Sequence, residues 1–267
     1  DTELFKQIPQ MHPAERSVVL DELIQRVMVP YLVVGIVLLL LGLLILKSPL
    51  PEINTENEDA ELSKANAGKK SIFDFPFLIL GAVAIFLHVG TQVISIDTII
   101  GYATSMDIPL LEAKVFPSYT LFATICGYML GVIAIPKLIS QKKAFQLFTM
   151  LGCVFSLLII LVKTRVVFLG HDTDLSIWFL VLLGFANSLI WAGIWPLAMK
   201  GLGRFTKLGA SIMIMGLCGN GLLPLVYGYL ADLQGVKEAY WILIPCYLYL
   251  IYYAFYGHKV KRWSFKL

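Results

Sequence analysis

The chain has 267 residues, of which 58% are hydrophobic and only 15% are charged, and its mean hydropathy is +0.79. Water-soluble domains carry roughly 25% charged residues, so this composition excludes an ordinary soluble protein and indicates an integral membrane protein. The formal net charge of +3 indicates no particular partner, because membrane proteins distribute their charges by side of the membrane.

Apolar runs of about 20 residues recur along the chain, and this is the length that a helix needs to cross a bilayer. They are continuous rather than alternating, which favours helices over membrane strands. Residues 1–27 are polar and mildly acidic, and we expect an extracytoplasmic loop or a short surface helix there. The first span is predicted at 28–47, with Pro30 tolerated in its first turn. Residues 48–74 are charged and lack an apolar period, which predicts a flexible linker.

Six further spans are predicted after the linker, forming a bundle at 75–256, and a short tail follows at 257–267. Fourteen of the 21 Lys and Arg residues fall on the side of the linker and the tail, so we expect that side to be cytoplasmic. The chain starts at Asp1 without an initiator Met, which suggests a piece of a longer protein. The six spans lie approximately at 75–105, 117–135, 144–161, 177–199, 210–230 and 240–255.

The sequence carries no pattern that is typical of an enzyme. We find no Walker loop, no zinc-ligand spacing and no nucleophile elbow. The four cysteines lie inside apolar spans without metal or redox spacing and are interpreted as small core residues: Cys126, Cys153, Cys218 and Cys246. We therefore expect no catalytic residues, no metal and no cofactor.

The span at 75–105 carries polar residues on one face. His88, Thr91, Gln92, Ser95 and Tyr102 follow the spacing of a single helical face. The amide of Gln92 can both donate and accept hydrogen bonds, which suits a ligand with neighbouring hydroxyl groups. The alternative is hydrogen bonding between helices, typically worth below roughly 1–2 kcal/mol for each polar pair. For His88, an ordinary interior histidine with satisfied hydrogen bonds is a further alternative.

Asp97 is the one acidic residue inside a predicted span. A charge at the centre of a bilayer costs roughly 2.5–3.5 kcal/mol on insertion scales, so such a residue faces a cavity or a partner. Asp97 is therefore a candidate acceptor for a substrate hydroxyl or for a proton. Alternatively it lies in the outer third of a broken helix and reaches water, since an unbroken helix would place it opposite His88.

The span at 177–199 carries Asn187, Trp191 and Trp195 at spacings of four, so one helical face would hold an amide and two indoles. Apolar walls with a few well-placed polar groups are typical of small-ligand pockets. The alternatives are packing inside the bundle for the tryptophans, or an interfacial position for Trp195.

The span at 210–230 interrupts its own helix. Gly216, Gly219 and Gly221 surround Asn220, and Pro224 follows one turn later. A locally unwound helix would expose backbone groups that a cavity or a neighbouring helix must satisfy, which makes Asn220 a candidate site residue. Alternatively, these glycines only permit close contact between helices.

Several stretches together resemble one family. They are RVMVPYLVVG followed by PLPEI, then VGTQVISIDTIIGYA, NSLIWAGIWPLAMKGLG and FTKLGASIMIMGLCGNGLLPLVYGYLAD. The last two cover about 50 contiguous residues. The chain is similar to the sugar–proton symporters of the major facilitator superfamily, in the fucose/glucose/galactose permease branch. The resemblance implies helices 6 to 12 of that fold, the C-terminal half, in a bacterial inner membrane.

The resemblance also implies a function, namely import of a monosaccharide with protons by alternating access, together with a missing N-terminal helical bundle. Gln92 falls on the branch's motif, whereas Asp97 stands where a small or neutral residue is expected, and Ala192 stands where Pro is frequent. The family assigns proton coupling to carboxylates in the half that is not present here. The expected site is therefore Gln92, Asn187, Trp191, Asn220, His88, Asp97 and Trp195. A sugar sensor or structural partner derived from a transporter half is the alternative.

Overall fold

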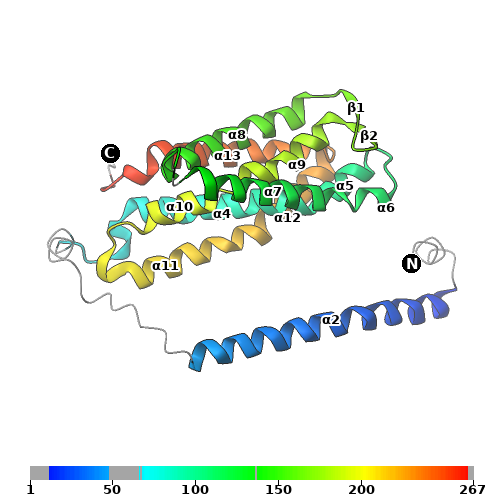
Figure 1. Ribbon diagram of the computed structural model, residues 1–267, viewed down its shortest axis with the longest axis horizontal. Coiled ribbons are helices and arrows are strands. Elements are labelled where there is room, and N and C mark those ends of the chain that lie inside the picture. The colour runs from blue at the N-terminus through cyan, green and yellow to red at the C-terminus, as the bar shows by residue number, and fades with distance from the viewer. Residues whose placement is uncertain (1–11, 48–65, 67, 136, 264–267) are drawn as a thin grey trace. The chain divides into compact units, whose positions relative to one another are not determined.

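The computed structural model describes residues 12–47, 66, 68–135 and 137–263, and it confirms the predicted all-α membrane class. Seven helical segments in this described part are long and apolar enough to cross a membrane, as predicted. The chain divides into two compact units, residues 1–54 and 55–267, which are described separately (Figure 1).

The first unit contains helix α2 (Pro13–Lys47), with 35 residues and a length of about 52 Å. Residues 13–27, part of the predicted loop or short surface helix at 1–27, are continuous with the helix of the predicted span at 28–47. Pro30 lies inside the helix and not in its first turn. An ion pair between Arg26 and Glu22 (3.0 Å) on one helical face supports this earlier start. The expected loop at 1–11 and most of the expected linker lie outside the described residues.

The second unit contains the other six membrane-length segments, and most of them are built from more than one helix (Figure 1). Their boundaries lie close to the predicted spans. In chain order the elements are η2 (Ile72–Asp74), α4 (Pro76–Asp97), α5 (Ile99–Thr104), α6 (Leu110–Ala113), α7 (Phe116–Ala134), α8 (Gln141–Leu161), β1 (Arg165–Phe168), β2 (His171–Asp174), α9 (Leu175–Asn187), α10 (Ile190–Met199), η3 (Gly203–Phe205), α11 (Thr206–Met215), η4 (Gly216–Cys218), α12 (Gly219–Gln234), η5 (Glu238–Ile242), α13 (Leu243–Phe255) and η6 (Gly257–Lys259).

Proline explains one irregularity in these helices. Pro196 lies inside α10 and has no N–H, so the carbonyl of Ala192 loses the donor it would have four residues later. The side-chain amide of Gln141, at the start of α8, donates to that carbonyl at 2.6 Å. This contact ties α8 to α10 at a point where the helical ladder is open.

Glycine permits the close approach of α12 and η4 to α4. A Cβ atom on Gly219 would lie 2.0 Å from the carbonyl oxygen of Phe86, and one on Gly216 would lie 2.8 Å from that of Ala82. Gly221, by contrast, has no neighbour within 4 Å. Close helix contact is therefore the role of the first two glycines, and a 3₁₀ turn at η4 is the only interruption between α11 and α12 in these described residues.

A short antiparallel hairpin, which was not predicted, joins α8 to α9. Phe168 pairs with His171, so Leu169 and Gly170 form a two-residue turn, with φ angles of 50° and 83°. Positive φ at both central residues matches the right-handed twist of the strands. The ring of His171 lies between Glu112 and Tyr119, with hydrogen bonds to both side chains, which holds the hairpin against α6 and α7.

One corner of the bundle is fixed by Lys237. Its ammonium group donates to the Asp174 carboxylate at 3.0 Å and to the Val162 carbonyl at 2.5 Å. Asp174 also caps α9 by accepting from the Ser176 N–H. Burial would raise the pKa of Asp174, but the Ser176 and Lys237 hydrogen bonds outweigh it and hold that pKa below its ordinary value of 3.8. The charged form of Asp174 therefore stabilises the fold.

Candidate functional site

The polar face predicted on α4 is divided by burial. His88, Thr91 and Ser95 are at most 1% exposed, Gln92 is half-buried, and Asp97 is exposed at the last position of the helix. The Thr91 hydroxyl donates to the His88 carbonyl and the Ser95 hydroxyl to the Gln92 carbonyl, both at 2.8 Å. Two of the predicted polar groups thus bond to their own helix.

Asp97 lies at a break between two helices. Helix α4 ends at this residue and α5 begins at Ile99, with Thr98 between them. The Thr98 hydroxyl hydrogen-bonds to the Ile94 carbonyl (2.6 Å) and to the Tyr240 hydroxyl (2.8 Å). The break in the helix is thereby held in place, and the exposed carboxylate of Asp97 is outside the bundle core.

Asn187 lies in the interior of the bundle. It is 1% exposed, and its side-chain oxygen accepts a hydrogen bond of 2.8 Å from the Tyr247 hydroxyl of α13. The Tyr247 ring packs directly against Gly152 of α8. Tyr247 thus joins α13 to the buried amide of α9, and we call Asn187 and Tyr247 the interior polar group.

Two atoms of this interior have no partner within the described residues, Nδ1 of His88 and Nδ2 of Asn187. Buried polar atoms are normally paired, and ordered water satisfies many that side chains leave open. Sequence reasoning missed Tyr247, because nothing distinguishes it from the other tyrosines of α13.

The single face expected for Asn187, Trp191 and Trp195 is not formed. The helix is interrupted at Ser188 and Leu189, where α9 ends and α10 begins. Asn187 points to Tyr247, whereas the two indoles stack on each other, with centroids 5.8 Å apart and planes 14° apart. Both tryptophans are half-buried. We call these two side chains of α10 the indole pair.

Asn220 is exposed in the first turn of α12. Pro224 lies four residues later and has no N–H, so the carbonyl oxygen of Asn220 has no helical donor. The unwound helix expected here is limited to the 3₁₀ turn of η4.

Helices α10 and α12 both pack on α4. Ala198 of α10 meets Gly81, and Leu223 of α12 meets Gly90. Gln92 therefore lies on α4, and the indole pair and Asn220 lie on α10 and α12, the two helices that pack on α4. None of the seven predicted site residues lines the two cavities found in the second unit, which lie elsewhere.

No protein-family model matches the chain. A glucose/galactose transporter of Brucella abortus is 28% identical over 235 residues, which cover 86% of this chain and 53% of that protein. The L-fucose–proton symporter of Escherichia coli is 26% identical over 254 residues, covering 92% of this chain and 55% of that protein. The chain spans about half the length of these relatives.

Among solved structures, the E. coli fucose:proton symporter FucP superposes with a TM-score of 0.72 at 21% identity, covering 95% of this chain and 60% of that structure. The same transporter in its outward conformation gives a TM-score of 0.71. The resemblance expected from the sequence is thereby confirmed: the chain is a multi-pass membrane protein with a major portion of the major facilitator superfamily fold, similar in sequence to the sugar transporters of that superfamily.

Proposed function

We propose that the chain supplies one wall of a monosaccharide pathway in a proton-coupled symporter, and that a second, N-terminal helical bundle supplies the other wall. The observation that carries this proposal is the half-buried indole pair on α10, a helix that packs on α4, where the amide of Gln92 is also half-buried. Two stacked indoles can cover the apolar C–H face of a sugar ring, and an amide can fix its hydroxyls.

Exposure ranks the candidate residues for this role. Gln92, Trp191, Trp195 and Asn220 have side chains that a sugar at the surface of this bundle can reach. His88 and Asn187 are buried, so we assign both to the interior of the bundle, where Asn187 belongs to the interior polar group. Asp97 lies at the end of α4 and is assigned to the mouth of the pathway.

The relatives' names and the charge distribution support the remaining parts of the proposal. The similar proteins are named as glucose/galactose and L-fucose–proton transporters, which suggests a hexose with protons as the cargo. The excess of Lys and Arg at the ends where α4 begins and α10 ends favours a cytoplasmic position for these ends and for the C-terminus, in a bacterial inner membrane. Alternating access would then move the two bundles about a site between them.

Equilibrium hexose binding to the complete protein that carries this chain tests the proposal. We expect Trp191→Ala and Gln92→Ala each to weaken binding at least about tenfold, equivalent to about 1.4 kcal/mol. Trp241→Ala, at a 49% exposed indole of η5 outside the proposed wall, is the matched control and should bind normally.

Unchanged affinity in both wall variants would refute the proposed site. Uptake into proteoliposomes under a proton gradient separates the functions: binding without proton-driven accumulation would favour the sugar sensor over the symporter.

A further inference from the structure

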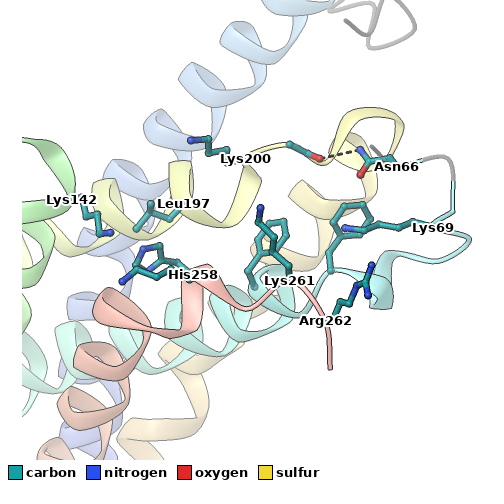
Figure 2. Close-up of a pocket in the computed structure, with 12 residues that line it drawn as sticks. Asn66, Lys69, Lys142, Leu197, Lys200, His258, Lys261 and Arg262 are labelled. Atoms are coloured by element: carbon teal, nitrogen blue, oxygen red, sulfur yellow. Dashed lines mark hydrogen bonds between the residues drawn. The ribbon is translucent and has the colours of Figure 1, made fainter. Parts of the chain in front are cut away.

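A cavity of about 710 Å³, which no residue of the proposed sugar wall lines, lies at the end of the bundle where α4 begins and α10 ends. Its lining comes from four parts of the second unit: the segment before α4, the start of α8, the end of α10 and the stretch after α13. Figure 2 shows Lys261 between Lys142 on one side of the cavity and Lys69 on the other.

The lining of this cavity is strongly basic. No acidic side chain is among its lining residues, and His258 adds an imidazole to the cations. The six cationic lining residues are Lys69, Lys142, Lys200, Lys259, Lys261 and Arg262. We call this cavity the basic pocket.

The cations of the basic pocket are not neutralised by ion pairs within the described residues. The ion pairs found there involve Arg26, His171 and Lys237, none of which lines the pocket. The acid that acts on Lys69 of the pocket is Asp74, whose carboxylate accepts the backbone N–H groups of Lys70 and Ser71 at 2.9 Å. Asp74 is exposed and caps η2, so its charge is directed to the backbone.

Lys69 shows the effect of this environment. Burial lowers its pKa from the ordinary value of 10.5, and the positive charges of Lys261 and Arg262 lower it further, although Asp74 acts in the opposite direction. The ammonium group lies 3.7 Å from the centre of the Phe75 ring, an attraction that holds it at the pocket. A bound anion would relieve the repulsion among these three cations.

The walls of the basic pocket are also partly apolar. Phe75, Phe77 and Leu197 line it together with the cations, and Asn66 donates to the Gly201 carbonyl at 3.1 Å to close one side (Figure 2). A single small anion would fill little of 710 Å³. A larger ligand with an anionic head and an apolar or uncharged remainder matches both kinds of wall.

We infer that the basic pocket binds a phosphate group carried on an organic molecule, either the headgroup of an anionic phospholipid or a soluble phosphorylated compound. The pocket lies where two membrane-length segments end, which is the depth of lipid headgroups, and basic pockets between helix ends are known to suit such headgroups. Lysine and arginine side chains bind phosphate oxygens by charge-assisted hydrogen bonds.

Native mass spectrometry of the full chain, purified in a neutral detergent, tests this inference. The probes are dioctanoyl phosphatidylglycerol, dioctanoyl phosphatidylcholine, inorganic phosphate and glucose 6-phosphate. We expect phosphatidylglycerol to bind and the zwitterionic phosphatidylcholine not to compete with it. Displacement of phosphatidylglycerol by glucose 6-phosphate or by phosphate at comparable concentration would identify a soluble ligand instead, and failure of both to displace it would identify the lipid.

Charge-matched variants make the test specific to the pocket. Lys261→Gln combined with Arg262→Gln removes two exposed cations that line the pocket, and Lys137→Gln combined with Lys143→Gln removes two exposed cations that do not. The first variant should bind phosphatidylglycerol at least tenfold more weakly, and the second should bind it normally. Equal binding by the pocket variant and the unmodified chain, or equal losses in both variants, would overturn the inference. Neither result depends on sugar binding, so the proposed transport function is tested separately.

Discussion

The contact between α12 and α4 at Gly219 predicts a large effect from one added methyl group. In Gly219→Ala the new Cβ would lie 2.0 Å from the Phe86 carbonyl oxygen, whereas real Cβ contacts are essentially never shorter than 3.0 Å. The two helices would therefore have to separate by about 1 Å, and overpacking of this kind costs about 1–3 kcal/mol.

Gly221→Ala is the matched control, because this position lies in the same helix and has no neighbour within 4 Å. Both substitutions gain the same helix propensity of about 1 kcal/mol, so the difference between the two variants isolates the clash. For a chain of this size 1 kcal/mol corresponds to about 2–4 °C in Tm, and Gly219→Ala should therefore melt about 2–12 °C below Gly221→Ala.

Thermal unfolding in detergent, followed by the loss of the monomer peak in size-exclusion chromatography, measures this difference. A Gly219→Ala variant that melts at or above the temperature of Gly221→Ala would refute the close contact of α12 with α4, and with it the arrangement of Asn220 beside that helix.

Two further predictions concern single polar groups. Tyr247→Phe removes the donor to the buried Asn187 amide and should destabilise the chain by about 1–3 kcal/mol. Tyr252→Phe, at a 42% exposed ring, is the control and should be nearly neutral in the same melting assay. Equal stability of the two variants would contradict the interior polar group. The pKa of Asp174 is lower in the folded chain than its ordinary value of 3.8, so its stabilisation is complete above that value and is lost as the pH falls below it. The difference in Tm between the unmodified chain and Asp174→Asn should therefore be largest near neutral pH and shrink below about pH 4. The control is Asp172→Asn, at an exposed position. A difference in Tm for Asp174→Asn that stays constant with pH would contradict the Lys237–Asp174 contact.

The membrane class and the number of spans could be predicted from the sequence, because hydrophobic length is a local property. The start of α2 could not, because residues 13–27 mix charged with apolar residues and therefore lie outside the continuous apolar run that identifies a span; the i, i+4 pair of Glu22 with Arg26 is one indication that the helix extends over them. The hairpin at 165–174 is similarly hidden, since strands of four residues give too short a pattern and their turn is signalled by Gly170 alone.

The candidate site shows where helical spacing fails. Asn187, Trp191 and Trp195 have the spacing of one face, yet the interruption at Ser188 and Leu189 and the hydrogen bond from Tyr247 turn the amide into the bundle. The partner that decides this orientation lies 60 residues away in sequence, so no local pattern reveals it. Gln92 and the indole pair needed no such partner, and their half-burial is compatible with the predicted substrate role.

The corner held by Lys237 has a consequence for how this end of the bundle opens. The Lys237 ammonium group, which lies just before η5 and α13, contacts Val162 at the C-terminal end of α8 and Asp174 at the N-terminal cap of α9. None of these helix ends can therefore fray without breaking a contact that it shares with the others. Local unfolding at this corner is therefore one cooperative event, and the backbone amides next to Val162, Asp174 and Lys237 should show a common free energy of opening in hydrogen exchange.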